Sequence, residues 1–178
     1  MSYYCRLCLV FLILVTVKTL SQNKVKNFII EDEFTFVVNY AMPVDSLLKM
    51  CHFEQVNKNA FKAIKDERLY QSGPRGSNTI SVKAISFTED IYLSDVITAL
   101  ETKGCRSLDV LELLYFGYIY QDIQKERPLV APLAKFWLSG NPYMYVLWGG
   151  AKGRGLYSFP INDKNKIDAR IWFLVVKN

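Results

Sequence analysis

The sequence contains a single histidine, His52, in 178 residues. This scarcity excludes metal centres built from several histidines, and any triad with a histidine base depends on His52 alone. If this segment is a strand, its neighbour Cys51 is badly placed to pair with it, because adjacent side chains on a strand point to opposite faces. We expect a partly buried, hydrogen-bonded histidine, and we predict no catalytic residue, no metal site and no cofactor.

Cysteine is also scarce, with four residues in the chain. Cys5 and Cys8 lie near the N-terminus, which leaves Cys51 and Cys105 for the folded domain. In an oxidising compartment these two can form a disulfide worth about 3–4 kcal/mol on the chain-entropy estimate. The alternative is two free thiols, which are common in protein cores. The sequence leaves both readings open.

Low-complexity segments and internal repeats are absent after residue 30, so residues 22–178 are expected to form a single domain. A basic stripe is absent too. The formal net charge is +5, but the lysines and arginines are spread in small groups along the chain. Nucleic-acid binders usually gather such residues on one surface, so we expect no nucleic-acid partner.

The apolar run near the N-terminus, residues 7–17, is short. It follows Arg6 and precedes the small residues Thr19 and Ser21. As a helix it would cover about half of a hydrocarbon core of roughly 30 Å. The pattern predicts a signal peptide over residues 1–21 and a secreted, periplasmic or extracellular protein. The alternative is an uncleaved signal that anchors the chain through this run, which is the only membrane contact we expect.

Two periodicities alternate along the rest of the chain. Apolar residues at helical spacing predict helices at 44–51, 94–103 and 108–116. Alternating or continuous β-branched and aromatic residues predict strands at 34–40, 79–87, 129–138, 143–148, 156–161 and 170–176. The sum predicts an α+β domain, in which a helical first half packs on a mainly antiparallel sheet formed largely by the C-terminal half.

Helix ends carry polar residues and glycine where capping requires them. Ser94 and Ser107 are predicted N-caps, because a hydroxyl can accept a hydrogen bond from an orphan backbone N–H. Gly104 is placed for a left-handed C-terminal cap. Asp109 and Glu112 share one face of the following helix, where they can serve acid–base chemistry or simply complement the helix dipole.

The glycine-rich segment from Gly149 to Gly155 is the sharpest local feature. Its glycines bare the backbone amides, and Lys152 and Arg154 add positive charge, so it could contact an anion. It is no P-loop, because a strand and not a helix follows it. The alternative is a β-hairpin connection whose glycines supply positive φ angles.

Aromatic residues are dense in the last third of the chain. Tyr143 and Tyr145 share one face of a predicted strand, and Trp148 lies on the other face. One face is expected to be core, and an exposed one would resemble the surfaces that bind sugars or proteins. We predict Tyr143, Tyr145, Lys152 and Arg154 as ligand-binding residues.

Four segments resemble a family of small, functionally uncharacterised bacterial proteins: residues 36–57, 104–124, 128–137 and 170–178. Their order is similar to a strand and short helix, a helix rich in "ELL", a strand with "PIVAL" and a closing "RFLAV" strand. The resemblance carries no catalytic residue. In outline, the Gly104-Cys105-Arg106 entry to a helix and the later Trp- and Gly-rich sheet are also similar to C-type-lectin-like domains. That fold is an alternative, although the second cysteine pair and the calcium ligands of those domains are missing.

The sequence favours a non-catalytic binding or interaction domain, exported or held at a membrane surface, with an unidentified protein or glycan as its ligand. The second hypothesis is a hydrolase or lyase that works through Asp109 and Glu112. The third is a structural component of an envelope assembly.

Overall fold

The computed structural model describes residues 27–65, 76–162, 164 and 166–177, with the side chain of Leu133 left out. The predicted signal peptide, and with it Cys5 and Cys8, lies outside the described residues. The helices are α2 (Val44–Met50), α3 (Lys58–Ile64), α4 (Leu93–Thr102), α5 (Val110–Ile119) and α6 (Ile123–Glu126). The strands are β1 (Ile29–Asn39), β2 (Gln55–Val56), β3 (Ser77–Ser86), β4 (Ile91–Tyr92), β5 (Cys105–Ser107), β6 (Leu129–Leu138), β7 (Asn141–Gly150), β8 (Gly153–Pro160), β9 (Lys166–Ile167) and β10 (Trp172–Lys177).

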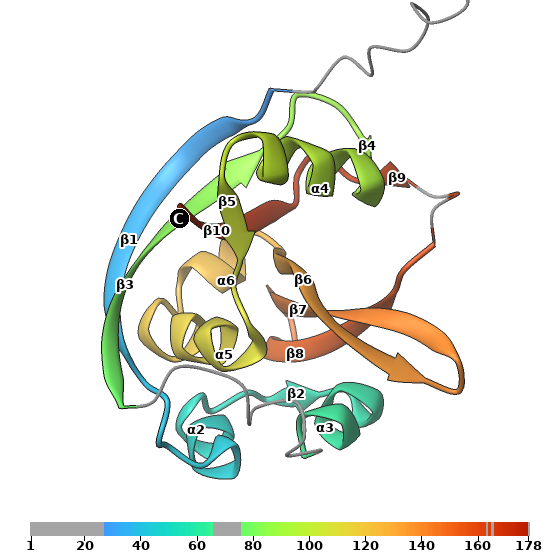
Figure 1. Ribbon diagram of the computed structural model, residues 1–178. Helices are drawn as coiled ribbons and strands as arrows, with labels where there is room; N and C mark the ends of the chain where they lie inside the picture. Colours follow the sequence, from blue (N-terminus) through green and yellow to red (C-terminus); the bar gives the residue numbers. More distant parts are fainter. Residues whose placement is uncertain (1–26, 66–75, 163, 165, 178) are drawn as a thin grey trace, which may run out of the picture.

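The main sheet has eight strands in the order β1-β3-β10-β6-β7-β8-β2, and β5 pairs with β10 beside this path. All pairings are antiparallel except those of β10 with β6 and of β2 with β8. A separate two-stranded sheet joins β4 to β9. The α+β class and the mainly antiparallel sheet, drawn largely from the C-terminal half, are confirmed. The first half adds the long curved pair β1 and β3 at one end (Figure 1).

The central strands β3, β10, β6 and β7 alternate their side chains between two buried clusters, which lie on the two faces of the sheet. On β10, Leu174 belongs to the first cluster, whereas Phe173 and Val175 belong to the second. The first cluster also takes in the buried side chains of α2, α3 and α5, and the second takes in those of α4. We call these the α5 face and the α4 face. As the apolar run of residues 170–176 predicts, β10 is buried on both.

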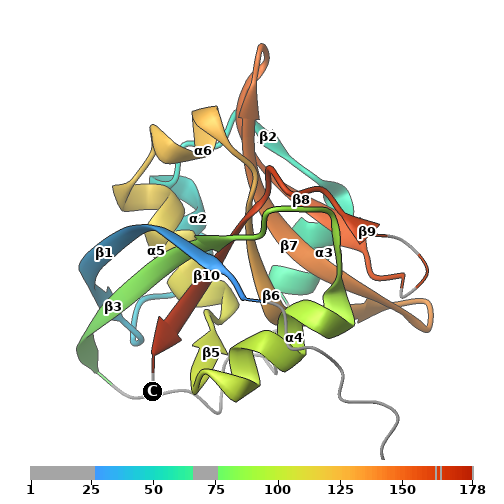
Figure 2. The same ribbon diagram turned by 90° about the horizontal axis from the view of Figure 1, so that it is seen from above.

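The α4 face is only partly covered. α4 packs against β5, β6 and β4, and the small β4–β9 sheet lies beside it (Figures 1 and 2). Its buried residues, which include Leu93, Val96 and Leu100, pack with Ile85 and Phe173. No helix of the second cluster extends over β7 and β8 among the described residues. This gap in the helical cover creates the cavity described below.

The two predicted N-caps are wrong. Ser94 lies inside α4, whose N-cap is Tyr92 without a side-chain hydrogen bond. Ser107 ends β5, and Asp109 caps α5 in a reciprocal box with Glu112. A box satisfies two orphan groups at once, so it outcompetes a lone hydroxyl. Gly104 does take the left-handed conformation expected after α4, with φ +63°.

Candidate functional site

The four predicted ligand residues do not form one surface. Lys152 is exposed in the turn between β7 and β8, which projects at the top of Figure 2. Tyr143 is half-buried, Tyr145 is 1% exposed and Arg154 is 4% exposed. A ligand arriving from solvent therefore reaches Lys152 readily and cannot reach Tyr145 or Arg154 without opening the core.

Arg154 holds the fold together instead of facing an anion. Its guanidinium donates to the backbone oxygens of Cys51 at 2.6 Å and Gly117 at 3.1 Å. Its backbone N–H donates to a carboxylate oxygen of Glu54 at 2.7 Å. The segment Gly149–Gly155 is mostly strand, with a two-residue turn at Ala151 and Lys152. The hairpin alternative is thus confirmed, although Gly153 is the only one of its four glycines with a positive φ, 92°, and Arg154 faces inward.

Tyr143 and Tyr145 lie on the same strand face, as predicted, but this is the α5 face. Their ring centroids lie 5.5 Å and 4.7 Å from that of Phe136 on the neighbouring strand β6. Tyr145 belongs to the first core cluster and Tyr143 packs against it. These rings stabilise the hairpin that β6 and β7 form, so the exposed aromatic face is the other one.

Cys51 and Cys105 are both free thiols in the structure. Cys51 ends α2 and is buried, where its thiol lies 3.4 Å from the backbone oxygen of Leu114. Burial raises the pKa of this thiol to about 12, against a smaller lowering effect of Arg154. Cys105 is half-buried on β5, which pairs with β10. The prediction of a partly buried His52 is wrong, because this residue is exposed; its backbone is left-handed, with φ 48°.

The two acids Asp109 and Glu112 form hydrogen bonds within the fold. Glu112 is 1% exposed, and its Oε1 accepts from Tyr40 Oη at 2.6 Å and Arg106 Nη2 at 2.9 Å. Its Oε2 accepts from Arg106 Nη1 at 2.7 Å and from the backbone N–H of Asp109 at 2.9 Å. Burial alone would raise the pKa of Glu112, but the bonds from Arg106 and Tyr40 outweigh it and lower that pKa.

This network leaves Glu112 poorly suited to acid–base catalysis. A carboxylate has about four lone-pair sites, and four donors from the protein occupy them. A general base needs a lone pair aimed at its substrate. Asp109 serves as the N-cap of α5, where its carboxylate accepts the backbone N–H of Glu112 at 2.8 Å.

A cavity of about 740 Å³ lies on the α4 face, in the gap that α4 leaves. We call it the side cavity. Its apolar wall comes from alternate residues of neighbouring strands: Val130 of β6, Met144 and Val146 of β7, and Phe159 of β8. Met144 is paired with Phe159 and Val146 with Val130, so the strand register places these four side chains next to one another. Trp148, two residues further along β7, extends it to the rim.

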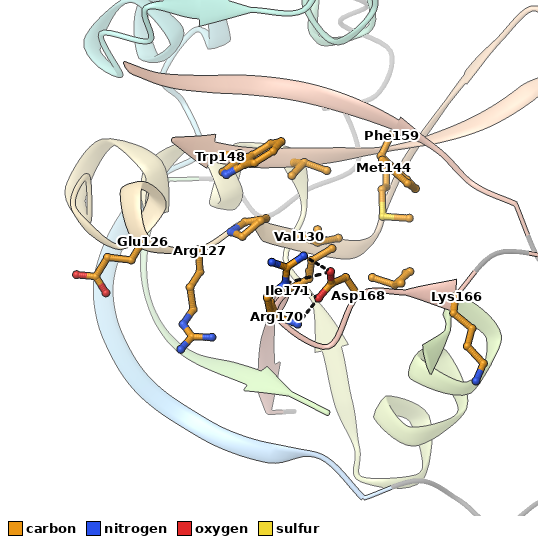
Figure 3. Close-up of a pocket in the computed structure, with 13 residues that line it drawn as sticks. Glu126, Arg127, Val130, Met144, Trp148, Phe159, Lys166, Asp168, Arg170 and Ile171 are labelled. Carbon is orange, nitrogen blue, oxygen red and sulfur yellow. Dashed lines mark hydrogen bonds and ion pairs between the residues drawn. The ribbon is translucent and has the colours of Figure 1, made fainter. Parts of the chain in front are cut away.

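The opposite wall comes from the chain between β9 and β10. Ile167 and Ile171 add apolar surface there, and Asp168 and Arg170 form an ion pair at 2.5 Å beside them. Figure 3 shows this pair across from Trp148 and Met144, with Arg127 on one side of it and Lys166 on the other. Glu126 and Pro128 complete the lining. The site is an apolar hollow with a charged rim.

Two exposed rings mark the cavity as accessible. Trp148 is 52% exposed and Phe159 is 51% exposed. The prediction that Trp148 lies on the strand face opposite Tyr143 and Tyr145 is correct. The predicted ligand surface, however, was the tyrosine face. The alternation of Met144, Val146 and Trp148 was the available signal. Only the cover of helices decides which of two apolar faces is closed.

No family model, curated protein or solved structure matches this chain. The resemblances to the uncharacterised bacterial family and to C-type-lectin-like domains therefore stay predictions. The fold and the cavity define the class at a coarser level, an α+β protein with an open hollow on one face of a mixed sheet. No helix in the described part of the chain is long and apolar enough to cross a bilayer.

Proposed function

We propose that this protein is a non-catalytic binding domain that takes its ligand in the side cavity. The observation that carries the proposal is the combination of volume and lining: about 740 Å³, bounded by Val130, Met144, Val146 and Ile171 with a charged rim. Ligand sites are typically hollows of about 300–1,000 Å³ with mostly apolar walls and a few polar groups. The saturated carboxylate of Glu112 gives the hydrolase hypothesis no supporting geometry.

The uncovered face also argues for a partner that fills it. A folded monomer normally shields apolar strand residues with a helix or a second sheet, since each buried apolar side chain contributes about 1.5–3 kcal/mol. Here Trp148 and Phe159 stand half in water above the buried wall. A ligand that covered these rings would gain the free energy of burying their apolar surface. This surface replaces the one predicted from Tyr145 and Arg154.

The experiment compares two exposed tryptophans on the same sheet. Trp148 lines the cavity, whereas Trp137 on β6 is 70% exposed and lies outside it. Binding of the neutral fluorescent probe N-phenylnaphthylamine is measured for the wild type, Trp148→Ala and Trp137→Ala. We expect Trp148→Ala to weaken binding at least fivefold and Trp137→Ala to leave it within twofold. Equal effects of the two variants, or no binding by the wild type, contradict the proposal.

Export is the second part of this proposal, and it rests on the apolar run of residues 7–17 with Arg6 before it. The experiment is expression of the full chain in a host that secretes, followed by intact mass of the recovered protein. We expect a mass that lacks residues 1–21. A full-length product that fractionates with membranes supports the anchored alternative, and a full-length product in the cytosol contradicts export.

A further inference from the structure

We infer that the ligand of the side cavity is an amphipathic organic anion, whose apolar body lies on Met144 and Val146 and whose charge is met by Arg127 and Lys166. This inference rests on the proposed function and names its substrate class. It follows from which charges on the rim are already neutralised within the fold and which are left for a ligand.

One of the two acidic residues in the lining, Asp168, is neutralised by an ion pair. Asp168 receives the guanidinium of Arg170, with Nε at 2.9 Å from Oδ1 and Nη2 at 2.5 Å from Oδ2. The same carboxylate accepts the backbone N–H of Arg170 at 2.8 Å. These bonds hold the pKa of Asp168 at about 2, so the pair stays ionised and contributes no net charge at neutral pH. The second acid, Glu126, extends away from the apolar wall in Figure 3, as the side chains of Arg127 and Lys166 also do, and all three belong to the lining.

Two cations remain on the rim. Neither Arg127 nor Lys166 forms an ion pair with a residue that the structure describes. Each lies over an aromatic ring instead, with Arg127 at 5.1 Å from the centroid of Trp172 and Lys166 at 5.5 Å from that of Tyr92. A ring leaves the hydrogen-bond donors of its cation free, because the contact uses only the face of the cation. Both groups can therefore still donate to an anion.

The geometry sets the shape of this ligand. Arg127 and Lys166 lie at separate points of the rim, on either side of the Asp168–Arg170 pair (Figure 3). The apolar wall of β7 and β8 faces them across the hollow. A compact inorganic anion would leave the wall bare, and a neutral hydrocarbon would leave the cations unused. An acyl or aryl carboxylate, or a sulfonate, satisfies both.

The experiment uses two probes that differ in one charged group. Anilinonaphthalene sulfonate has the ring skeleton of N-phenylnaphthylamine with a sulfonate added. We expect the wild type to bind the sulfonate more tightly than the neutral probe. Arg127→Gln and Lys166→Gln should each weaken sulfonate binding about two- to fivefold, as exposed charge contacts do, and leave the neutral probe unchanged. High salt should weaken only the sulfonate.

The matched control is Lys152→Gln, which removes a positive charge from the exposed β7–β8 turn outside the cavity. It should leave both probes within twofold, and a larger effect on the sulfonate would overturn the assignment to the rim. Near-ultraviolet circular dichroism must match the wild type in every variant, since loosened cores also bind these dyes. Neutral-probe binding without preference for the sulfonate overturns this inference and leaves the proposed function standing. Absence of binding by both probes overturns both.

A second arm separates two sources of such an anion. Dodecanoate that displaces the sulfonate, where dodecanol at equal concentration does not, identifies a free small molecule. Sedimentation with phosphatidylglycerol vesicles, lost in the double variant of Arg127 and Lys166 and without displacement by dodecanoate, identifies a lipid headgroup. Either result supports an anion site. Dodecanol that competes as well as dodecanoate contradicts it.

Discussion

Neighbouring residues of one strand point to opposite faces of the sheet, and the two faces differ in how helices cover them. On β7, Tyr145 and Leu147 are buried in the cluster of the α5 face, whereas Met144 and Val146, which are 2% and 8% exposed, form the floor of the side cavity. The α5 face also contains a polar network around Glu112 with four hydrogen bonds. Where helical cover is complete, apolar and polar groups alike are used for stability. Where the helical cover stops, the same strand forms a wall of the side cavity.

The sharpest way to break this comparison is to shorten one side chain on each face of β7. Leu147→Ala removes a fully buried side chain from the α5 face and should cost about 2–5 kcal/mol of unfolding free energy. Met144→Ala enlarges a hollow that already exists, so we expect less than half that loss. Urea denaturation measures both. Equal losses would mean that the side cavity is closed in solution.

The next prediction concerns buried and exposed ion pairs. Arg106→Met leaves the carboxylate of Glu112 buried without its strongest partner and should cost about 3 kcal/mol, the lower end for a broken buried pair because Arg106 is itself partly exposed. The control is Lys83→Met, which breaks the pair with Glu33 on the β1–β3 edge and should cost less than about 1 kcal/mol. Thermal and urea unfolding check both. A larger loss in the control would contradict the structural role of the network.

The pH dependence of stability gives a smaller effect of known sign. The folded protein holds the pKa of Glu112 below its usual value of about 4.3, chiefly because the bonds from Arg106 and Tyr40 outweigh burial. An acid with a lowered folded pKa contributes stability above its unfolded pKa and loses it as pH falls through the folded one. The wild type should therefore exceed Glu112→Gln in stability at pH 7, and the difference should shrink below about pH 4. A difference that is constant across this range would show that charge is not involved.

The smallest effect separates the two cysteines. Cys51 is buried on the α5 face with a pKa raised to about 12, whereas Cys105 is half-buried beside the other cluster. Since the thiolate is the reactive form, iodoacetamide should label Cys105 well before Cys51 in the folded protein. Peptide mass spectrometry with and without reductant reads both. Labelling of both residues only after reduction would show a disulfide instead of two free thiols.

Much of the fold follows from local pattern. Periodicity predicts α2, α4, β3, β7 and β10, because an element's spacing of apolar residues reports its own geometry. Local pattern predicts the ends of helices and strands less accurately than their presence. Glycine in a helix interior is destabilising, yet α5 continues through Gly117 to Ile119. A Cβ on Gly117 would lie 2.9 Å from Leu147 Cδ1, so the glycine is there to let helix and strand approach, a reason that no local window contains.

The amino-acid sequence by itself determined the α+β class, the two-faced character of β7 and the hairpin between β7 and β8. Each of these depends on residues close together in the chain. The tertiary structure alone decided that Arg154 turns inward to Cys51 and Gly117, that Asp109 and Glu112 are held within a closed network, and that Trp148 borders a hollow. Both faces of a strand can be equally apolar, and which one meets solvent depends on where a helix distant in sequence packs.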